Sequence, residues 1–590
     1  MTFWFQAGVY RCASVLLVSA SVAASVAAAD GRQQRLRSAD AAFRAGYAAE
    51  KNGDLASAQG QFEKVVLLAP DIAEGHSALG SVLLQLGQYQ RSIRELSRAL
   101  TLKSDDRTAQ MNLAIAYEQS GDHEKSLSRF RSLDRNTAPP LPPNVAIFYI
   151  RALAATQQTE LAIAKTQDAL AAAPENPVLH DTLGSFEAQK QDWNGAVSQF
   201  KESVRLDPNF PEAHLHLGLT LMMQQRTSEG IEELTTATEL SPQDPFAQVE
   251  LGKAMIANGE NEKAIPVLQR ALTLAPSSLD AKYQLALALQ ASGQEEQAIP
   301  IFQEVVTADP RNAPALTNLA LALVQTGKAK EAIPLYQRAL KEVPGDPLVY
   351  QDMGVAYLQQ SDLADAVSEF REGLKLAPEA YELHYDLGLA LKLKDDIQAA
   401  ASELELAARL NPNSPDPPYT LGVLDMQTGH FDDAVEQLKT ALTLRPENGD
   451  GWAILGSVYK QQNKQAEAMD ALQKAIQMMP NQPGPHVTLA GILAQQGRTA
   501  EAASERKKAA DLSRIAVNRQ RATFAVNTGR ALLLKGRITD AIERYQEAVS
   551  SDPTFVEAHR GLAAALERAG RTAEAEVERG KDAQLDQVGH

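Results

Sequence analysis

A 34-residue repeat runs through most of this 590-residue chain and limits the folds that it can adopt. Proline recurs at this interval over ten consecutive positions. A second ladder in the same register holds glycine or alanine, from Gly46 to Ala490, and a third holds alanine twelve residues later. The proline ladder comprises Pro174, Pro208, Pro242, Pro276, Pro310, Pro344, Pro378, Pro412, Pro446 and Pro480. Such a period indicates stacked copies of one small unit, not one compact core.

Each period is expected to form a helical hairpin. In residues 280–310, Leu285 and Leu289 keep helical spacing, Gly293 interrupts the run, and Phe302 lies in the apolar face that follows. A small residue in the first helix lets the two backbones approach closely. The closing proline lacks an N–H group, so the chain turns into the next hairpin. One hairpin cannot bury its apolar faces alone, and its neighbours complete the core.

These three ladders, with a bulky residue before the glycine and aromatic residues between them, resemble the tetratricopeptide repeat (TPR) family. The resemblance covers about residues 39–580 and implies an all-α fold, an α-solenoid of about sixteen helix-turn-helix units. It further implies a right-handed superhelix whose first helices line a concave surface. The expected segments are units 1–3 at 39–142 ending in a proline-rich loop, units 4–14 at 143–510, an irregular basic insertion at 511–524, units 15–16 at 525–580, and a polar tail at 581–590.

The first 29 residues have the pattern of an export signal. One charge, Arg11, precedes an apolar stretch of small residues, and Ala27-Ala28-Ala29 has the small-x-small pattern of a cleavage site. An uncleaved anchor is the alternative, although the serines in this stretch make it a poor membrane-spanning helix. We therefore expect a signal peptide at 1–29, a linker at 30–38, an exported chain that is periplasmic or extracellular, and no membrane span after cleavage.

Composition and motifs argue against several classes of function. The net charge of −17 argues against nucleic acid as a partner, because phosphate binding needs a basic surface. The single cysteine, Cys12, excludes disulfide frameworks and zinc sites made of cysteines. The repeats leave no room for a separate catalytic domain, and no phosphate-binding loop, nucleophile elbow or HExxH motif occurs. We expect no enzyme activity, no catalytic residue, no cofactor and no metal site.

Two sets of residues are predicted to face a partner from the first helices. A glutamine recurs five residues after the glycine or alanine anchor, and a tyrosine recurs at another inward position; amides suit a peptide backbone or a sugar, and tyrosine is a common interface anchor. The alternative for the glutamines is that glutamine simply forms helix well at an exposed position. The candidates are Gln189, Gln325, Gln359, Gln427, Gln461, Tyr283, Tyr385 and Tyr419.

Charge is uneven along the chain. Residues 351–450 carry a net charge of −12, whereas residues 451–550 carry +6, with the basic residues gathered around the irregular segment. The arginines Arg514, Arg519 and Arg521 are therefore candidates for orienting a partner or for pairing two copies head to tail. The alternative is that this segment is only a lengthened helix that joins two sub-arrays.

The sequence thus predicts a non-catalytic scaffold that binds other proteins, through extended or helical segments, on the concave face of a long TPR array. We place it in the cell envelope. The alternative function is a scaffold for polysaccharide binding or export, which the glutamines and tyrosines keep open. Glycan binding and self-association are left open as further properties.

Overall fold

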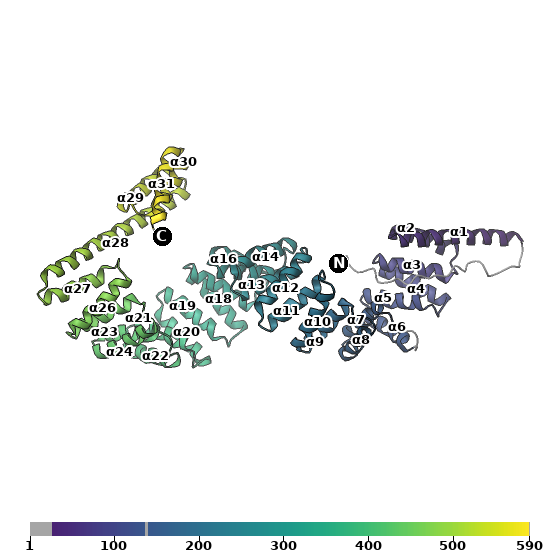
Figure 1. Ribbon diagram of the computed structural model, residues 1–590, viewed down its shortest axis with the longest axis horizontal. Coiled ribbons are helices and arrows are strands. Elements are labelled where there is room, and N and C mark those ends of the chain that lie inside the picture. Colours follow the sequence, from purple (N-terminus) through teal and green to yellow (C-terminus); the bar gives the residue numbers. More distant parts are fainter. Residues whose placement is uncertain (1–25, 136–139, 589–590) are drawn as a thin grey trace. The chain divides into compact units, whose positions relative to one another are not determined.

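The computed structural model describes residues 26–135 and 140–588. These residues form 31 helices joined by short turns, with no strand among them (Figure 1). The all-α prediction is confirmed. The chain divides into two compact units, Met1–Ala308 and Asp309–His590, and each is described by itself.

The helices of the first unit are α1 (Val26–Lys51), α2 (Leu55–Leu68), α3 (Ala73–Gln85), α4 (Tyr89–Leu102), α5 (Arg107–Gln119), α6 (His123–Arg135), α7 (Pro143–Ala155), α8 (Thr159–Ala172), α9 (Pro177–Gln189), α10 (Trp193–Leu206), α11 (Pro211–Met223), α12 (Thr227–Leu240), α13 (Pro245–Ala257), α14 (Asn261–Leu274), α15 (Leu279–Ala291) and α16 (Glu295–Ala308).

The helices of the second unit are α17 (Ala313–Gln325), α18 (Ala329–Glu342), α19 (Pro347–Gln359), α20 (Leu363–Leu376), α21 (Tyr381–Leu393), α22 (Ile397–Leu410), α23 (Asp416–Thr428), α24 (Phe431–Leu444), α25 (Gly449–Gln461), α26 (Gln465–Met478), α27 (Pro483–Gln495), α28 (Thr499–Leu534), α29 (Ile538–Ser551), α30 (Val556–Arg568) and α31 (Thr572–Val588).

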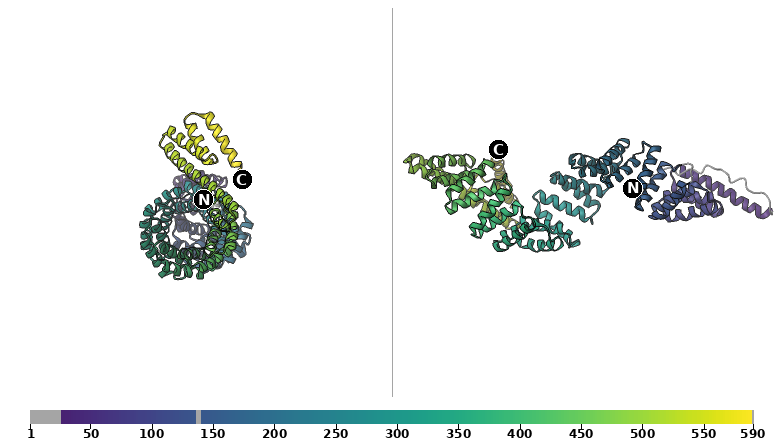
Figure 2. Two further views of the ribbon diagram at one scale, coloured as in Figure 1. Left: turned by 90° about the vertical axis from the view of Figure 1, so that its left-hand side faces the viewer. Right: turned by 90° about the horizontal axis from the view of Figure 1, so that it is seen from below.

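Within each unit, consecutive helices pair as hairpins, and each second helix also packs on the next first helix of that unit (Figure 2). The anchor glycine makes this packing close. A Cβ atom on Gly354 would lie 2.5 Å from the ring of Phe370, which is fully buried on the second helix of the same hairpin. In α4, the Ser92 hydroxyl donates a hydrogen bond of 2.6 Å to the carbonyl oxygen of Gly80. The close approach predicted between small residues of the two helices thus leaves room for a large side chain, sixteen residues after the anchor glycine.

Local signals set the helix ends. Asp106 caps α5 by accepting a hydrogen bond from the N–H of Ala109, and Asn312 caps α17 in the same way. Between the helices of a hairpin, one residue adopts a positive φ. It is often glycine, as at Gly293 with φ of 71°, but Gln191 takes the same conformation at 62°. The hairpin turn therefore favours glycine without requiring it.

The segment expected to be an irregular insertion, 511–524, lies inside one continuous helix. Helix α28 runs for 36 residues, so it is both the second helix paired with α27 and the first helix paired with α29. The proline ladder explains this difference. Arg514 stands 34 residues after Pro480, where a closing proline would end the helix, and no proline follows until Pro553.

Other expected boundaries also differ from the structure. Residues 30–38, expected to be a linker, belong to α1, because this stretch is rich in arginine and glutamine, which favour helix. The expected polar tail continues α31 as far as Val588. Ile150, which replaces the small anchor of α7, is fully buried. Most of the expected signal peptide lies outside the described residues, and its cleavage remains a prediction.

Candidate interaction surface

Buried histidines recur at one position of several first helices and join those hairpins to neighbouring segments. The Nδ1 atom of His384 lies 2.6 Å from Glu403 Oε2 on the second helix, and its Nε2 atom lies 3.0 Å from the carbonyl oxygen of Pro378. The same two contacts are made by His76, His214 and His559. These histidines therefore hold the array together. Among the described residues, no group of three or more His, Cys, Asp or Glu side chains is arranged to hold a metal ion.

The glutamine column lies at the carboxyl ends of first helices. Gln189, Gln325, Gln359 and Gln461 are the last residues of α9, α17, α19 and α25, and Gln427 is the last but one of α23. All five are exposed to solvent. The structure does not form them into one row. Gln325 and Gln359 lie on adjacent first helices, as do Gln427 and Gln461, but Leu393 takes this position in α21 between them.

Gln189 is in the first unit, whereas the other four glutamines are in the second. The neighbouring first helix, α11, carries the exposed Met223 at the equivalent position. Partner binding by these glutamines stays a prediction.

The three candidate tyrosines occupy one position of the repeat but have different surroundings. Tyr283, in α15 of the first unit, packs edge-on against Phe302, with the ring centroids 6.0 Å apart. Tyr385 lies on α21 with its hydroxyl 3.4 Å from Thr420 Oγ1 on α23, and Tyr419 is on α23. Burial raises the pKa of both Tyr385 and Tyr419. All three rings are half-buried, so only part of each is accessible to a partner.

The three candidate arginines, all on α28, do not form one site. Arg519 makes an ion pair with Asp552 Oδ2, and its guanidinium lies 4.5 Å from the ring centroid of Phe555. It thus holds the turn after α29. Arg514 lies 3.3 Å from Asp511 on the same helix, while Arg521 is exposed and makes no hydrogen bond or ion pair in the described part of the chain. The grouping of Arg519 with the other two as partner-facing residues is not supported by this geometry.

A row of acidic side chains on α19 and α21 was not among the predicted site residues. Asp352 and Asp386 occupy the position next to the tyrosine position, and Gln351 Nε2 donates a hydrogen bond of 2.6 Å to Asp386 Oδ2. Burial, together with the neighbouring Asp346 and Asp386, raises the pKa of Asp352 to about 6. Burial also raises the pKa of Asp386. The net charge of −12 over 351–450 was the available sequence signal, but it did not identify the half-buried carboxylates.

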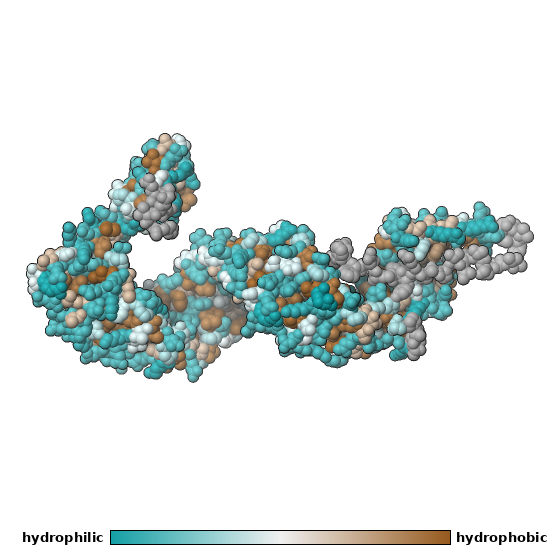
Figure 3. Space-filling view, viewed as in Figure 1, coloured by the Kyte–Doolittle hydropathy of each residue, from teal (hydrophilic) through white to brown (hydrophobic). Residues whose placement is uncertain are grey.

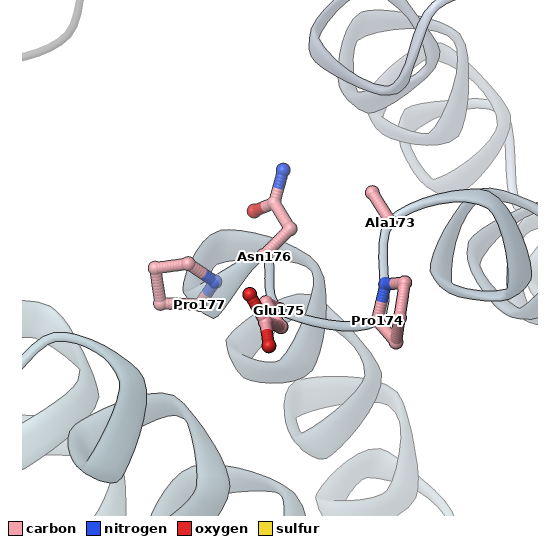
Figure 4. A pocket seen from close by; sticks show the side chains of 5 residues that line it. All are labelled: Ala173, Pro174, Glu175, Asn176 and Pro177. Carbon is pink, nitrogen blue, oxygen red and sulfur yellow. The ribbon is translucent and has the colours of Figure 1, made fainter.

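A hollow of about 410 Å³ lies at the turn between α8 and α9, lined by Ala173, Pro174, Glu175, Asn176 and Pro177 (Figure 4). Asn176 is occupied there as the cap of α9. In the space-filling view, exposed apolar residues are scattered among hydrophilic ones on the visible face (Figure 3). No helix in the described ranges has both the length and the apolar character to cross a membrane.

Several solved structures are similar to the chain. The APC/C hetero-tetramer Cut9-Hcn1 aligns at 15% identity over 79% of this chain and 99% of that chain, with a TM-score of 0.35. Yeast Tom70 aligns at 15% identity over 72% and 96%, with a TM-score of 0.33. MamA from Desulfovibrio magneticus RS-1 aligns at 22% identity over 28% and 95%, with a TM-score of 0.28. A search of curated proteins finds no match.

Family models match along the chain. They are the Cilia and flagella-associated protein 70 C-terminal domain at 303–525, the Cytochrome c-type biogenesis protein H TPR domain at 233–350, the TPR repeat at 184–225 and 529–570, and the Tetratricopeptide repeat at 43–107 and 77–139. Because these matches fall on helical hairpins that repeat one packing scheme, the chain belongs to the tetratricopeptide repeat family.

Proposed function

We propose that this chain is a non-catalytic scaffold of the cell envelope, which binds protein partners along the first helices of its repeats. Its membership of the TPR family supports a role in protein–protein interaction. The observation that carries the proposal is the set of accessible side chains on the first helices α17 to α25. Exposed glutamines lie at the ends of α17, α19, α23 and α25, and half-buried tyrosines and carboxylates lie on α19, α21 and α23. A repeated, pre-formed surface makes affinity from many modest contacts and avoids much of the ordering cost of binding.

Partner capture with matched variants tests this proposal. The chain is immobilised and exposed to an envelope extract, and proteins released by a salt step are identified. A variant with Gln359→Ala, Gln427→Ala and Gln461→Ala should lose a defined set of proteins that the parent retains. The control carries three exposed glutamines outside this column, Gln269, Gln297 and Gln303, replaced by alanine. Equal capture by both variants would remove the glutamine column from the binding surface.

The export part of the proposal has its own test. Cell fractionation, followed by determination of the N-terminal residue, should find the chain outside the cytoplasm and beginning at Asp30. A chain that keeps residues 1–29 and sediments with membranes would support the anchor instead.

Polysaccharide binding is the second candidate, and the half-buried rings of Tyr385 and Tyr419 favour it. They lie on successive first helices, which the contact between Tyr385 and Thr420 joins, and a ring face with amides suits a sugar. A glycan array distinguishes the two functions. Retention of a defined oligosaccharide that is lost in Tyr385→Ala would support this candidate, whereas an empty array would leave the protein-binding function alone.

A further inference from the structure

The middle of α28 has one helix face that the neighbouring hairpins leave uncovered, although Arg519 in this stretch contacts Asp552 and Phe555 after α29. Its buried residues fall into two groups, one that ends at Ala509 and one that begins at Ala522. Between them lie roughly three turns in which no residue is buried, and the helix can be followed there apart from its neighbours (Figure 1). Ile515 and Val517 are 58% and 47% exposed, and Phe524 is 75% exposed. Isolated exposed apolar residues are common, but Ile515 and Val517 lie within this segment and Phe524 lies shortly after it on the same helix.

Basic and apolar side chains share one face of α28 within this segment and just beside it. Residues spaced by three or four positions lie on the same side of a helix. We call the set of basic and apolar residues that follows this spacing here the α28 stripe. All of its members are exposed. The α28 stripe consists of Lys507, Arg514, Val517, Arg521 and Phe524. Asp511, which pairs with Arg514, lies on the same face between Lys507 and Arg514. Arg519 lies off the stripe and is occupied by Asp552. A surface of this kind fits an acidic protein surface that also offers apolar contact.

The chain carries such an acidic surface on α19 to α25. Glu382 and Asp450 lie exposed in the first turns of α21 and α25, and Asp386 is half-buried on α21. Burial and the neighbouring carboxylates Glu372 and Asp365 raise the pKa of Glu369. Burial and the nearby carboxylate of Asp433 raise the pKa of Asp425. These carboxylates therefore lie among other negative groups, and the segment as a whole has a net charge of −12.

We propose that the α28 stripe of one molecule binds the acidic surface of α19 to α25 on a second copy of the chain. Charge complementarity selects this occupant, because a single sequence supplies both a basic, partly apolar stripe and an acidic surface. The two surfaces differ, so the contact is heterologous and joins copies head to tail. The product is an open chain of copies, or a ring where the rotation closes. This inference goes beyond the proposed function, because it concerns the chain with no other protein present.

Sedimentation velocity of the purified full chain tests the proposal. At low ionic strength, the parent should form a series of species that grows with protein concentration, and at high salt it should be monomeric. The stripe variant, Lys507→Glu, Arg514→Glu and Arg521→Glu, should weaken association about tenfold or more. So should the acidic-surface variant, Glu382→Lys, Asp386→Asn and Asp450→Lys. Circular dichroism confirms that each variant keeps its helix content.

Mixing the two variants is the decisive arm. The acidic-surface variant retains a native stripe and the stripe variant retains a native acidic surface, so together they should form a one-to-one complex that grows no further. A control variant has the same change in charge as the stripe variant and should associate as the parent does. It carries Lys535→Glu, Arg537→Glu and Arg544→Glu. A parent that stays monomeric at low salt, reversals without effect, or variants that do not combine would overturn the proposal. Binding of a monomeric parent to vesicles of anionic lipid would also overturn it and assign the stripe to a lipid surface.

Discussion

His214 Nδ1 lies 2.6 Å from Glu233 Oε2, across the two helices of one hairpin. Its other ring nitrogen, Nε2, lies 3.1 Å from the carbonyl oxygen of Pro208. A carbonyl oxygen and a carboxylate both accept hydrogen bonds, so the ring satisfies both contacts when both nitrogens carry protons. Burial opposes the charged form, but the contacts to Glu233 and Pro208 outweigh it and raise the pKa of His214.

This contact predicts a pH-dependent stability of the α11–α12 hairpin. Because the folded-state pKa of His214 is raised, its stabilising contribution is complete below the ordinary histidine value of about 6.5 and declines as the pH rises through the folded-state value. His214→Gln should lower the local free energy of unfolding by about 1–2 kcal/mol at pH 5.5 and by less at pH 8. Hydrogen exchange of α11–α12 amides measures this, with α30 amides as the internal control. An equal loss at both pH values would contradict the prediction.

Asp352 should destabilise its hairpin at neutral pH. Burial and the nearby carboxylates raise its pKa to about 6, so the folded state binds a proton more tightly than the unfolded state does. The resulting cost is present at pH 7 and is relieved as the pH falls below about 6. Asp352→Asn should stabilise α19–α20 by about 1–2 kcal/mol at pH 7 and have little effect at pH 4. Hydrogen exchange at the two pH values tests this, and Asp365→Asn, at an exposed position, is the matched control.

Arg519 should stabilise the last hairpins of the chain. Although burial acts against it, hydrogen bonds from Thr554 and Arg519 lower the pKa of Asp552, so the contact stabilises the fold above the ordinary aspartate value and is lost as the pH falls through the folded-state value. Arg519→Ala leaves a nearly buried carboxylate without its cation and should cost about 1–3 kcal/mol. Limited proteolysis near 552–555 measures the effect. Arg521→Ala should change it little, since Arg521 has no such contact.

Phe370 should control the stability of its own part of the array. It is fully buried against Gly354, and Phe370→Ala should cost about 3–5 kcal/mol through lost contacts and the cavity left behind. Because each repeat contacts mainly its neighbours, faster hydrogen exchange should be confined to α19–α22. Leu376→Ala, on the same helix but 47% exposed, is the control. A uniform change over all helices would show that the array unfolds as one unit.

The sequence by itself determined the repeated hairpin. The spacing of Pro378, Gly354 and Phe370 sets where helices end, where two backbones approach, and which side chain fills the space between them. These are local relationships of fixed separation, so one sequence suffices to predict them. The same reasoning placed the glutamines on first helices, because their position follows from the register.

The tertiary structure decided which candidates share a surface and which are occupied elsewhere. Arg514 and Arg519 look equivalent in sequence, yet Arg519 is held by Asp552 and Phe555 across a turn, while Arg514 remains on an exposed face. Leu393 interrupts the glutamine column only when adjacent first helices are compared. The half-burial that raises the pKa of Asp352 likewise depends on the hairpins packed around it. Such properties arise from contacts between repeats, which the spacing within one repeat does not specify.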